Sequence, residues 1–294
     1  MTGEAAVAAV VEALQAPPAA HFLLLFDFDG TLCELAPTPE VSLLPAARRD
    51  LLAALAMHDD TTVGIVSGRR LEDVRQRVGL PAGFAGPHVI YAGLHGSEID
   101  AGDARWHHDG LDPALDAVRL LRVRAAAAVT DLPGAWVEDK GYSFVLHTRL
   151  AAPVDKRTAR DRVAALVGAA AVAAATAPGG ASEVAGPGAP SLRTQPGHEM
   201  LEVLPDIAWN KGDAVHWIGR HVRDRVAGPV RIMYVGDDLS DEDAFAALPP
   251  DGVSVAVGRR PSCARFHLDG PPDVELLLAR LAGARSPELE VDAR

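Results

Sequence analysis

Two aspartates, Asp27 and Asp29 in the stretch DFDGT, carry the first pattern in this sequence that could do chemistry. They follow the apolar run HFLLLF, so both carboxylates stand on a tight turn at the end of a predicted buried strand. Because the spacing is i, i+2 in an extended chain, both side chains can point to one side. One carboxylate can then attack phosphorus while the other handles the proton of the leaving group. Ordinary turn chemistry and a calcium loop are competing interpretations of the same residues.

A second acidic cluster ends the run VRIMYVGDD, at Asp237 and Asp238, and continues through Asp241, Glu242 and Asp243. Carboxylates from two separate strand ends supply the hard oxygen ligands that Mg²⁺ takes while it keeps several waters. Acids also gather at helix N-termini, where the helix dipole favours negative charge, and this explains Glu242 and Asp243. We expect Asp237 to be a metal ligand.

A cation and a hydroxyl should accompany these acids, because phosphoryl transfer depends mostly on positioning and charge neutralisation. Lys211, in WNKGDAVHWI at the start of an amphipathic helix, can supply the cation. Ser67 ends the run TTVGIVS and can supply the hydroxyl, together with backbone N–H groups at the start of the next helix. Taken singly, such a Lys is usually a solvated surface charge and such a Ser a helix cap. Their order along the chain, with the two acidic segments, favours a catalytic role.

Several apolar runs share one pattern, in which a short buried segment ends in polar residues or glycine and a helical stretch follows. Buried strands that alternate with helices predict an α/β fold, a parallel sheet with helices on both faces. Ligands bind beyond the carboxyl ends of such strands, where the polar clusters of this sequence stand. The expected strands lie within 21–31, 61–70, 88–96, 230–238 and 252–258, and helices within 44–58 and 69–79.

The middle of the chain has a different pattern and predicts a small inserted α+β domain. We expect a core domain of residues 1–105 and 205–294, interrupted by an insert at 106–204. The tract 169–196, rich in Ala, Gly and Pro, predicts a loop or the tip of a hairpin. Within the insert we expect helices at 112–129 and 154–167, and strand-like runs at 135–141, 142–150 and 198–205.

Composition excludes several other classes of protein. With 294 residues, of which 48% are hydrophobic, the chain can bury a full core. Its formal charge of −12 argues against a nucleic-acid partner, because such binding draws on clustered Lys and Arg. The apolar runs are too short to cross a membrane, and the N-terminal stretch MTGEAAVAAVVEALQAPP carries an acid where a secretory signal carries basic residues. We therefore expect a cytoplasmic protein, with Cys33 and Cys263 as reduced thiols.

The order DFDGT, Ser in VSGR, Lys in NKG, and GDDLSDED resembles the four motifs of haloacid-dehalogenase superfamily phosphatases, over nearly the whole chain. The resemblance implies a Rossmann-like core with a cap domain, and Asp27 as the nucleophile beside Asp29 as the general acid/base. It further implies that Ser67 and Lys211 bind the phosphoryl oxygens. Mg²⁺ would be held by the Asp27 carboxylate, the Asp29 backbone carbonyl and Asp237, with Asp238 and Asp241 in support.

Within the insert, the segments VEDKGYSFVLHTR and GHEMLEVLP, and before it YAGLHGSEI, are similar to trehalose-6-phosphate phosphatases. The pattern of that family is close to EDK, H-x-R and G-x-x-x-E-x-x-P, and the position of the insert resembles the larger type of cap. This similarity implies hydrolysis of trehalose 6-phosphate to trehalose and phosphate through an aspartyl-phosphate, the last step of trehalose biosynthesis, in functional partnership with trehalose-phosphate synthase. The implied substrate-binding residues are Glu138, Lys140, His147 and Glu202 in the insert, with Arg69, His95 and Glu98 on the core side.

The same residues are compatible with three other functions, which differ in how well the sequence supports them. Fold and motifs specify a reaction type better than a substrate, so a phosphatase for sucrose 6-phosphate or a mannosyl-phosphoglycerate is the nearest alternative. A catalytically silent module that binds a sugar phosphate or a synthase belongs to another class, and the intact Asp27, Asp29, Lys211 and Asp237 count against it. A calcium-binding protein is weaker still, because the acids lie in separate segments and not in one twelve-residue loop.

Overall fold

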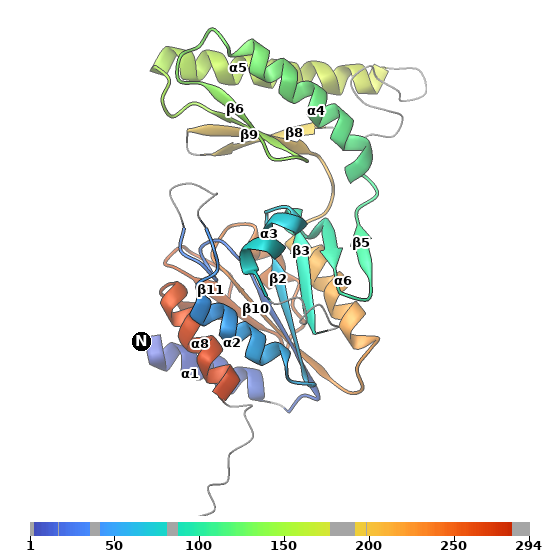
Figure 1. Ribbon diagram of the computed structural model, residues 1–294, viewed down its shortest axis with the longest axis vertical. Coiled ribbons are helices and arrows are strands. Elements are labelled where there is room, and N and C mark those ends of the chain that lie inside the picture. Colours follow the sequence, from blue (N-terminus) through green and yellow to red (C-terminus); the bar gives the residue numbers. More distant parts are fainter. Residues whose placement is uncertain are drawn as a thin grey trace, which may run out of the picture. The chain divides into compact units, whose positions relative to one another are not determined.

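The computed structural model describes residues 3–16, 18–35, 42–80, 88–176, 192–197 and 199–283 (Figure 1). The chain divides into two compact units. The core unit comprises Met1–Trp106 and Trp209–Arg294, and the inserted unit comprises His107–Ala208.

The core unit is built on an eight-stranded sheet in the order β12-β11-β10-β1-β2-β3-β4-β5. The six strands from β12 to β3 run parallel, which confirms the predicted parallel sheet, and β4 pairs with β3 in the antiparallel sense. The short strands β4 and β5 were not predicted, since three residues are too few to show an alternating pattern. The bounds are β1 His21–Phe26, β2 Thr61–Val66, β3 Val89–Gly93, β4 Glu98–Asp100, β5 Arg105–His107, β10 Val230–Gly236, β11 Val253–Val257 and β12 Phe266–Leu268.

Helices pack on both faces of this sheet, as expected. Central strand β1 shows why, because its side chains alternate between the two hydrophobic clusters. Leu24 and Phe26 pack with α1, α2, α3 and α8, whereas Leu23 and Leu25 pack with α6 and α7. A strand that is buried on both faces gives the loop beyond it a rigid support. The bounds of these helices are α1 Gly3–Gln15, α2 Ala46–Ala56, α3 Leu71–Val78, α6 Lys211–Arg223, α7 Asp241–Ala246 and α8 Pro271–Gly283.

The inserted unit is a four-stranded antiparallel sheet with two helices. Its order is β6-β7-β9-β8, and one face packs against the helices through Phe144, Leu146, Leu201 and Val203. The elements are α4 Leu111–Ala128, β6 Trp136–Asp139, β7 Phe144–His147, α5 Pro153–Thr176, β8 Leu192–Gly197 and β9 Met200–Pro205.

The tract 169–196, predicted as a loop or the tip of a hairpin, differs from a loop at both of its ends, and its last residues form one arm of a hairpin with β9. Helix α5 continues to Thr176, since alanine is the strongest helix former and dominates this stretch. At the other end, Leu192–Gly197 forms strand β8, whose Pro196 is tolerated because β8 lies at the edge of its sheet. Residues 177–191 lie outside the described part of the chain.

None of the helices that the structure describes is both long and apolar enough to cross a membrane.

The packing of the inserted unit gives a stability prediction at Phe144. This side chain is fully buried in the cluster between the sheet and the two helices. We expect Phe144→Ala to destabilise the inserted unit by about 3–5 kcal/mol, because the change removes apolar contacts and leaves a cavity. Urea denaturation followed by circular dichroism measures the loss.

Val123→Ala is the matched control, since Val123 lies on α4 of the same unit but is 58% exposed. Its expected effect is within about 0.5 kcal/mol. Equal effects of the two substitutions would contradict the assigned core.

Candidate active site

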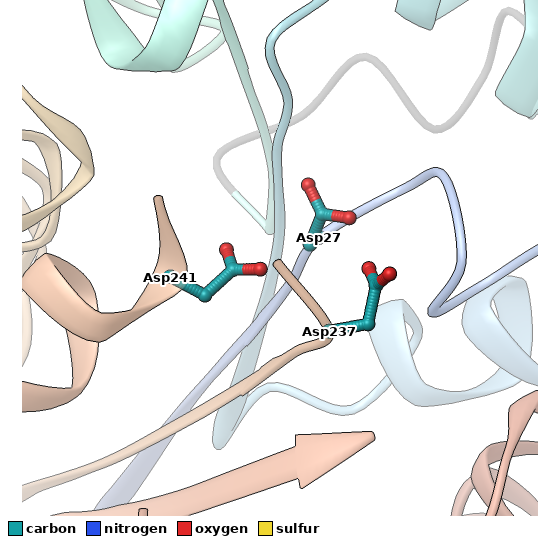
Figure 2. A group of neighbouring side chains, drawn as sticks. All are labelled: Asp27, Asp237 and Asp241. Atoms are coloured by element: carbon teal, nitrogen blue, oxygen red, sulfur yellow. The ribbon is translucent and has the colours of Figure 1, made fainter. Parts of the chain in front are cut away.

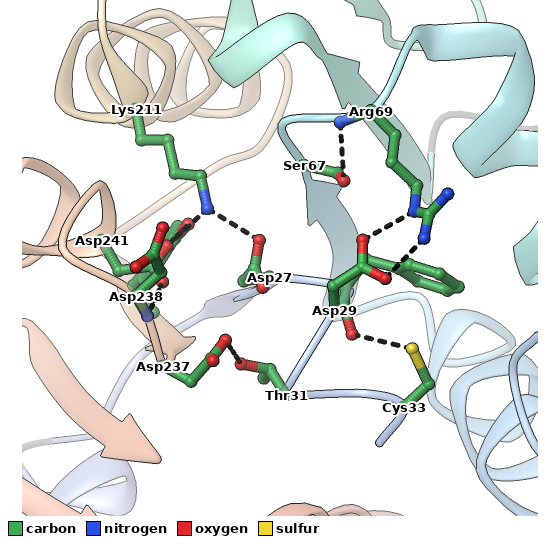
Figure 3. A network of polar contacts seen from close by, with 12 residues as sticks. Asp27, Asp29, Thr31, Cys33, Ser67, Arg69, Lys211, Asp237, Asp238 and Asp241 are labelled. Carbon is green, nitrogen blue, oxygen red and sulfur yellow. Dashed lines mark hydrogen bonds and ion pairs between the residues drawn. The ribbon is translucent and has the colours of Figure 1, made fainter. Parts of the chain in front are cut away.

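The candidate site lies at the carboxyl edge of the core sheet, where three neighbouring strands end. Asp27 follows β1, Ser67 follows β2 and Asp237 follows β10. Two helix starts contribute further side chains, Lys211 at the first residue of α6 and Asp241 at the first residue of α7. Residues far apart in the sequence therefore meet at one edge (Figure 3).

Three carboxylates form a compact group, Asp27, Asp237 and Asp241, whose nearest oxygens all lie within 4.8 Å of one another (Figure 2). Asp27 and Asp241 are buried, and Asp237 is half-buried. Hard carboxylate oxygens contributed by separate segments are suited to a divalent cation, and a cation would also relieve the repulsion among three acids. The geometry and chemistry of this donor set fit a metal ion.

The ammonium group of Lys211 bridges two of these acids. Its Nζ donates to Asp27 Oδ1 and to Asp241 Oδ1, both at 2.7 Å, and the side chain is 2% exposed. Desolvation alone would lower the pKa of Lys211, but the two carboxylates outweigh it and raise that pKa above its ordinary value. Lys211 is therefore a permanently charged, buried cation, not a solvated surface charge.

A capping box at the start of α6 fixes the backbone of Lys211. The Asn210 side chain accepts hydrogen bonds from the backbone N–H groups of Gly212 and Asp213, at 2.8 and 3.1 Å. Asp213 in turn accepts one from the backbone N–H of Asn210, at 3.0 Å. These bonds satisfy otherwise unpaired N–H groups and fix the point at which the Lys211 side chain leaves the helix.

Asp241 is held by a partner that the sequence analysis missed, Tyr234 of strand β10. The Tyr234 hydroxyl donates to Asp241 Oδ1 at 2.8 Å, and the backbone N–H of Asp238 donates to Oδ2 at 2.8 Å. A tyrosine among aliphatic residues in a buried strand could have given the signal, because a buried hydroxyl needs a partner. The side chain of Asp238 itself is exposed and is not one of the three grouped carboxylates.

Gly30 and Thr31 of the DFDGT stretch both determine where the Asp237 carboxylate lies. Thr31 Oγ1 donates to Asp237 Oδ1 at 3.1 Å. Gly30 has a φ of 80°, and a Cβ at this position would lie 2.1 Å from Asp237 Oδ2. Any other residue would strain the turn and displace the carboxylate.

Asp29 points its carboxylate at Arg69 and not at Lys211 (Figure 3). Arg69 donates to it from Nε at 2.6 Å and from Nη2 at 2.7 Å, in a fork that fixes the orientation of the acid. A third nitrogen of Arg69, Nη1, reaches Asp73 at 3.1 Å. Ser67 Oγ accepts from the backbone N–H of Arg69 at 3.1 Å, so Ser67 and Asp29 share one neighbour.

His95 and Glu98 brace the loop that follows β2. The backbone N–H of His95 donates to the carbonyl of Ser67 at 2.9 Å. Glu98 Oε2 accepts from the backbone N–H of Leu71 at 3.1 Å, at the start of α3. Both residues therefore contact the segment that carries Ser67 and Arg69.

The four expected residues of the inserted unit lie in or beside the strands β6, β7 and β9. Strand register places Glu138, Val145 and Glu202 in one row, on the face opposite the helix-packed Leu146. His147 Nε2 lies 2.7 Å from Glu138 Oε2, and the Ser143 hydroxyl donates to Glu202 Oε1 at 2.8 Å. In the turn between β6 and β7, the backbone N–H of Lys140 donates to the Ser143 carbonyl at 2.9 Å.

Trp136 was not predicted as a site residue, yet its ring stacks on His147 with centroids 4.7 Å apart and planes 15° apart. The residue is 43% exposed. Together with the Glu138 hydrogen bond, this stacking fixes the plane of the His147 ring.

A cavity of about 460 Å³ lies at the opposite end of the strands, beside the amino end of β1, and is lined by His21, His88 and His221 among others. His21 is the first residue of β1 and Asp27 follows the last, so the cavity is about 20 Å from the carboxylates. It is separate from the candidate site.

Known proteins match this chain over most of its length. A family model described as Trehalose-phosphatase matches residues 25–175 and 184–272. The chain is 38% identical over 272 residues to the trehalose-phosphate phosphatase of Mycobacterium marinum, with 90% of this chain and 62% of that protein covered. It is 35% identical over 295 residues to the trehalose-phosphate phosphatase of Mycobacterium tuberculosis, with 96% and 68% covered. The chain thus spans about 62% of the length of the first of these relatives.

Solved structures show the same fold. The C-terminal domain of the trehalose-6-phosphate phosphatase of C. albicans has a TM-score of 0.67 and 21% identity, covering 97% of this chain and 99% of that one. A trehalose-6-phosphate phosphatase related protein has a TM-score of 0.67 and 22% identity, covering 89% and 97%.

The repulsion among the three grouped carboxylates leads to a prediction for the stability of the metal-free protein. Desolvation, and then the charge of Asp241, raise the pKa of Asp237 to about 6. Because the folded state holds this proton more tightly than the unfolded state, the charged Asp237 costs stability as pH rises from about 4 to above 6. With chelator present at pH 8, we expect Asp237→Asn to stabilise the fold, by on the order of 2 kcal/mol.

Thermal or urea unfolding at pH 8 and pH 4 measures this difference, which should be much smaller at pH 4, where Asp237 is protonated in the folded state. Asp59→Asn, a change at an exposed aspartate, is the control and should have no effect at either pH. If Asp237→Asn is no more stable than the wild type at pH 8, the acids do not repel one another as described.

Proposed function

Because the chain belongs to the trehalose-phosphatase family, we propose that it hydrolyses trehalose 6-phosphate to trehalose and phosphate through an aspartyl-phosphate intermediate. This reaction would be the last step of trehalose biosynthesis, with a trehalose-phosphate synthase as the functional partner that supplies the substrate. The observation that carries the proposal is the buried contact of Lys211 with Asp27, in the group of three carboxylates.

Asp27 is the proposed nucleophile. Lys211 fixes its Oδ1, so the orientation of the whole carboxylate is set on the end of a rigid strand. In the first step a carboxylate oxygen of Asp27 attacks phosphorus, the bond from phosphorus to the sugar oxygen breaks, and the sugar leaves. Lys211 and Ser67 are proposed to bind the phosphoryl oxygens. The positive charge of Lys211 offsets their negative charge, and the hydroxyl of Ser67 donates a hydrogen bond to them.

Asp29 is the proposed general acid and base. It gives a proton to the departing sugar oxygen, then takes one from the water that attacks the phosphorus of the aspartyl-phosphate. That second step restores Asp27 and releases phosphate. The fork from Arg69 fixes the direction of the Asp29 carboxylate. Because the fork occupies both oxygens, one of its hydrogen bonds must open when Asp29 carries the proton. We also assign Arg69 to substrate binding, since a guanidinium matches phosphate geometry.

Mg²⁺ is the proposed metal, and it would neutralise phosphoryl oxygens when bound. The carboxylates of Asp27 and Asp237 and the backbone carbonyl of Asp29 are the proposed ligands, with Asp241 and Asp238 in support. The group of three carboxylates supports this assignment, because Mg²⁺ prefers oxygen ligands from few carboxylates and retains waters.

Substrate specificity is assigned to polar residues of both units. Glu138, Lys140, His147 and Glu202 are proposed to bind sugar hydroxyls or phosphate, together with His95 and Glu98 of the core unit. The row of Glu138 and Glu202, with His147 beside Glu138, supports this proposal because carboxylates and imidazole pair well with hydroxyl groups.

The nucleophile is tested with Asp27→Asn. We expect phosphate release from trehalose 6-phosphate to fall by at least about a thousand-fold, because an amide does not attack phosphorus at a useful rate. Release is measured with and without Mg²⁺, and wild-type activity should require the ion. The panel of substrates includes sucrose 6-phosphate and a mannosyl-phosphoglycerate.

Circular dichroism shows whether the Asp27→Asn variant keeps its fold. A folded variant with near wild-type turnover would exclude Asp27 as the nucleophile. Faster hydrolysis of another sugar phosphate in the panel would move the assignment to that substrate.

The sugar-binding residues are tested by single changes of Glu138, Lys140, His147 and Glu202 to Ala. A hydrogen bond to a charged group in a desolvated site contributes about 1.5–3 kcal/mol, so we expect kcat/KM for trehalose 6-phosphate to fall about ten- to a hundred-fold. Hydrolysis of a small aryl phosphate should change much less, since it needs only the core residues.

Asp116→Ala, at an 83% exposed aspartate of α4, is the matched control in the inserted unit and should leave both activities unchanged. If all four variants keep normal turnover of trehalose 6-phosphate, these residues do not recognise the sugar. Equal losses on both substrates would indicate general damage to the enzyme.

A further inference from the structure

Arg260 lies in the loop after β11, the strand next to β10 in the sheet, and reaches the loop that carries Asp237. Its side chain is 21% exposed. Nε donates to the backbone carbonyl of Asp237 and Nη2 to that of Asp238, both at 2.5 Å. Nη1 donates to Glu242 Oε1, also at 2.5 Å. One guanidinium therefore contacts three residues, Asp237, Asp238 and Glu242, which lie between the end of β10 and the first turn of α7.

These contacts fix the backbone at the point where the Asp237 side chain leaves it. Two neighbouring carbonyls bound by one planar group have little freedom to rotate. The turn cannot change its peptide orientation without breaking a charged hydrogen bond, which is stronger than a neutral one.

The third contact extends the restraint to Asp241. Glu242 lies in the first turn of α7 beside Asp241, and its other oxygen accepts from the backbone N–H of Cys263 at 2.8 Å. Arg260 and Cys263 thus hold the start of α7 from the same loop. Asp237 and Asp241 are two of the three grouped carboxylates, so one side chain outside the group restrains both.

We propose that Arg260 is a positioning residue that sets the relative placement of Asp237 and Asp241, and through it the affinity of the site for its divalent cation. The proposal rests on the proposed function in so far as that function needs the metal. Arg260 contacts two ligand-bearing backbone positions and a helix start, and not the reacting atoms.

The neighbouring Arg259 offers a matched control. Its side chain is 89% exposed, and its Nε lies 3.8 Å from Asp269, away from the acidic loop. Arg259→Met and Arg260→Met remove the same charge one residue apart, so a difference between them reflects the contacts of Arg260 and not net charge.

The experiment titrates the full 294-residue chain with Mg²⁺ in the absence of substrate, by isothermal titration calorimetry. We expect Arg260→Met to weaken Mg²⁺ binding by about ten- to a hundred-fold, the usual cost of removing a group that orients metal ligands. Arg259→Met should bind Mg²⁺ like the wild type. Arg260→Lys keeps the charge but not the planar fork, and should stay closer to Arg260→Met than to the wild type.

A second readout separates positioning from simple loss of stability. The rise in melting temperature caused by Mg²⁺ should shrink in Arg260→Met, whereas a merely structural role would lower the melting temperature equally with and without the ion. Arg260→Lys provides the same comparison if the Met variant does not fold.

Wild-type Mg²⁺ affinity in Arg260→Met, or full recovery of affinity in Arg260→Lys, would overturn the proposal. Because Mg²⁺ binding is measured without turnover, this failure is distinct from failure of the proposed function. A wild-type chain that binds Mg²⁺ but releases no phosphate from any sugar phosphate would refute only the latter.

Discussion

The ammonium group of Lys211, buried between Asp27 and Asp241, is the interaction on which the rest of the site depends. A buried charge is tolerated only with partners, and removing one partner of a buried ion pair typically costs about 3–5 kcal/mol. The starts of α6 and α7 must therefore lie next to the end of β1. Lys211 balances part of the acidic charge, and the third carboxylate, Asp237, leaves the group acidic enough to attract a divalent cation.

The surrounding structure serves to keep these groups in place. The adjacent strands β10, β1 and β2 bring three loops to one edge of the sheet. A capping box fixes Lys211, Tyr234 orients Asp241, and Thr31 orients Asp237. Gly236 has the same purpose, since a Cβ there would lie 2.3 Å from the Asp241 carboxyl carbon. Each contact is local, yet together they bring four charged groups from distant parts of the sequence within contact distance.

Much of this could be predicted from sequence, because strands that are buried on both faces are apolar throughout and end abruptly in acids. The meeting of Asp27 with Asp237 follows from parallel strands ending at one edge. The partners of Asp241 and Asp29 were not predicted, because the pairs Tyr234–Asp241 and Arg69–Asp29 depend on side-chain directions that residue spacing does not encode. The prediction for the tract 169–196 was incomplete for another reason. Its composition suggested a loop, but alanine favours the helix that continues to Thr176.

The central claim is that Asp27 becomes phosphorylated during turnover. Rapid acid quenching of the enzyme with trehalose 6-phosphate and Mg²⁺, followed by peptide mass spectrometry, tests this claim most directly. The account predicts that the peptide containing Asp27 gains the mass of one phosphoryl group during turnover, and that the Asp27→Asn chain gains none. Turnover with the phosphoryl group on another residue, or on none at any quench time, would contradict the account.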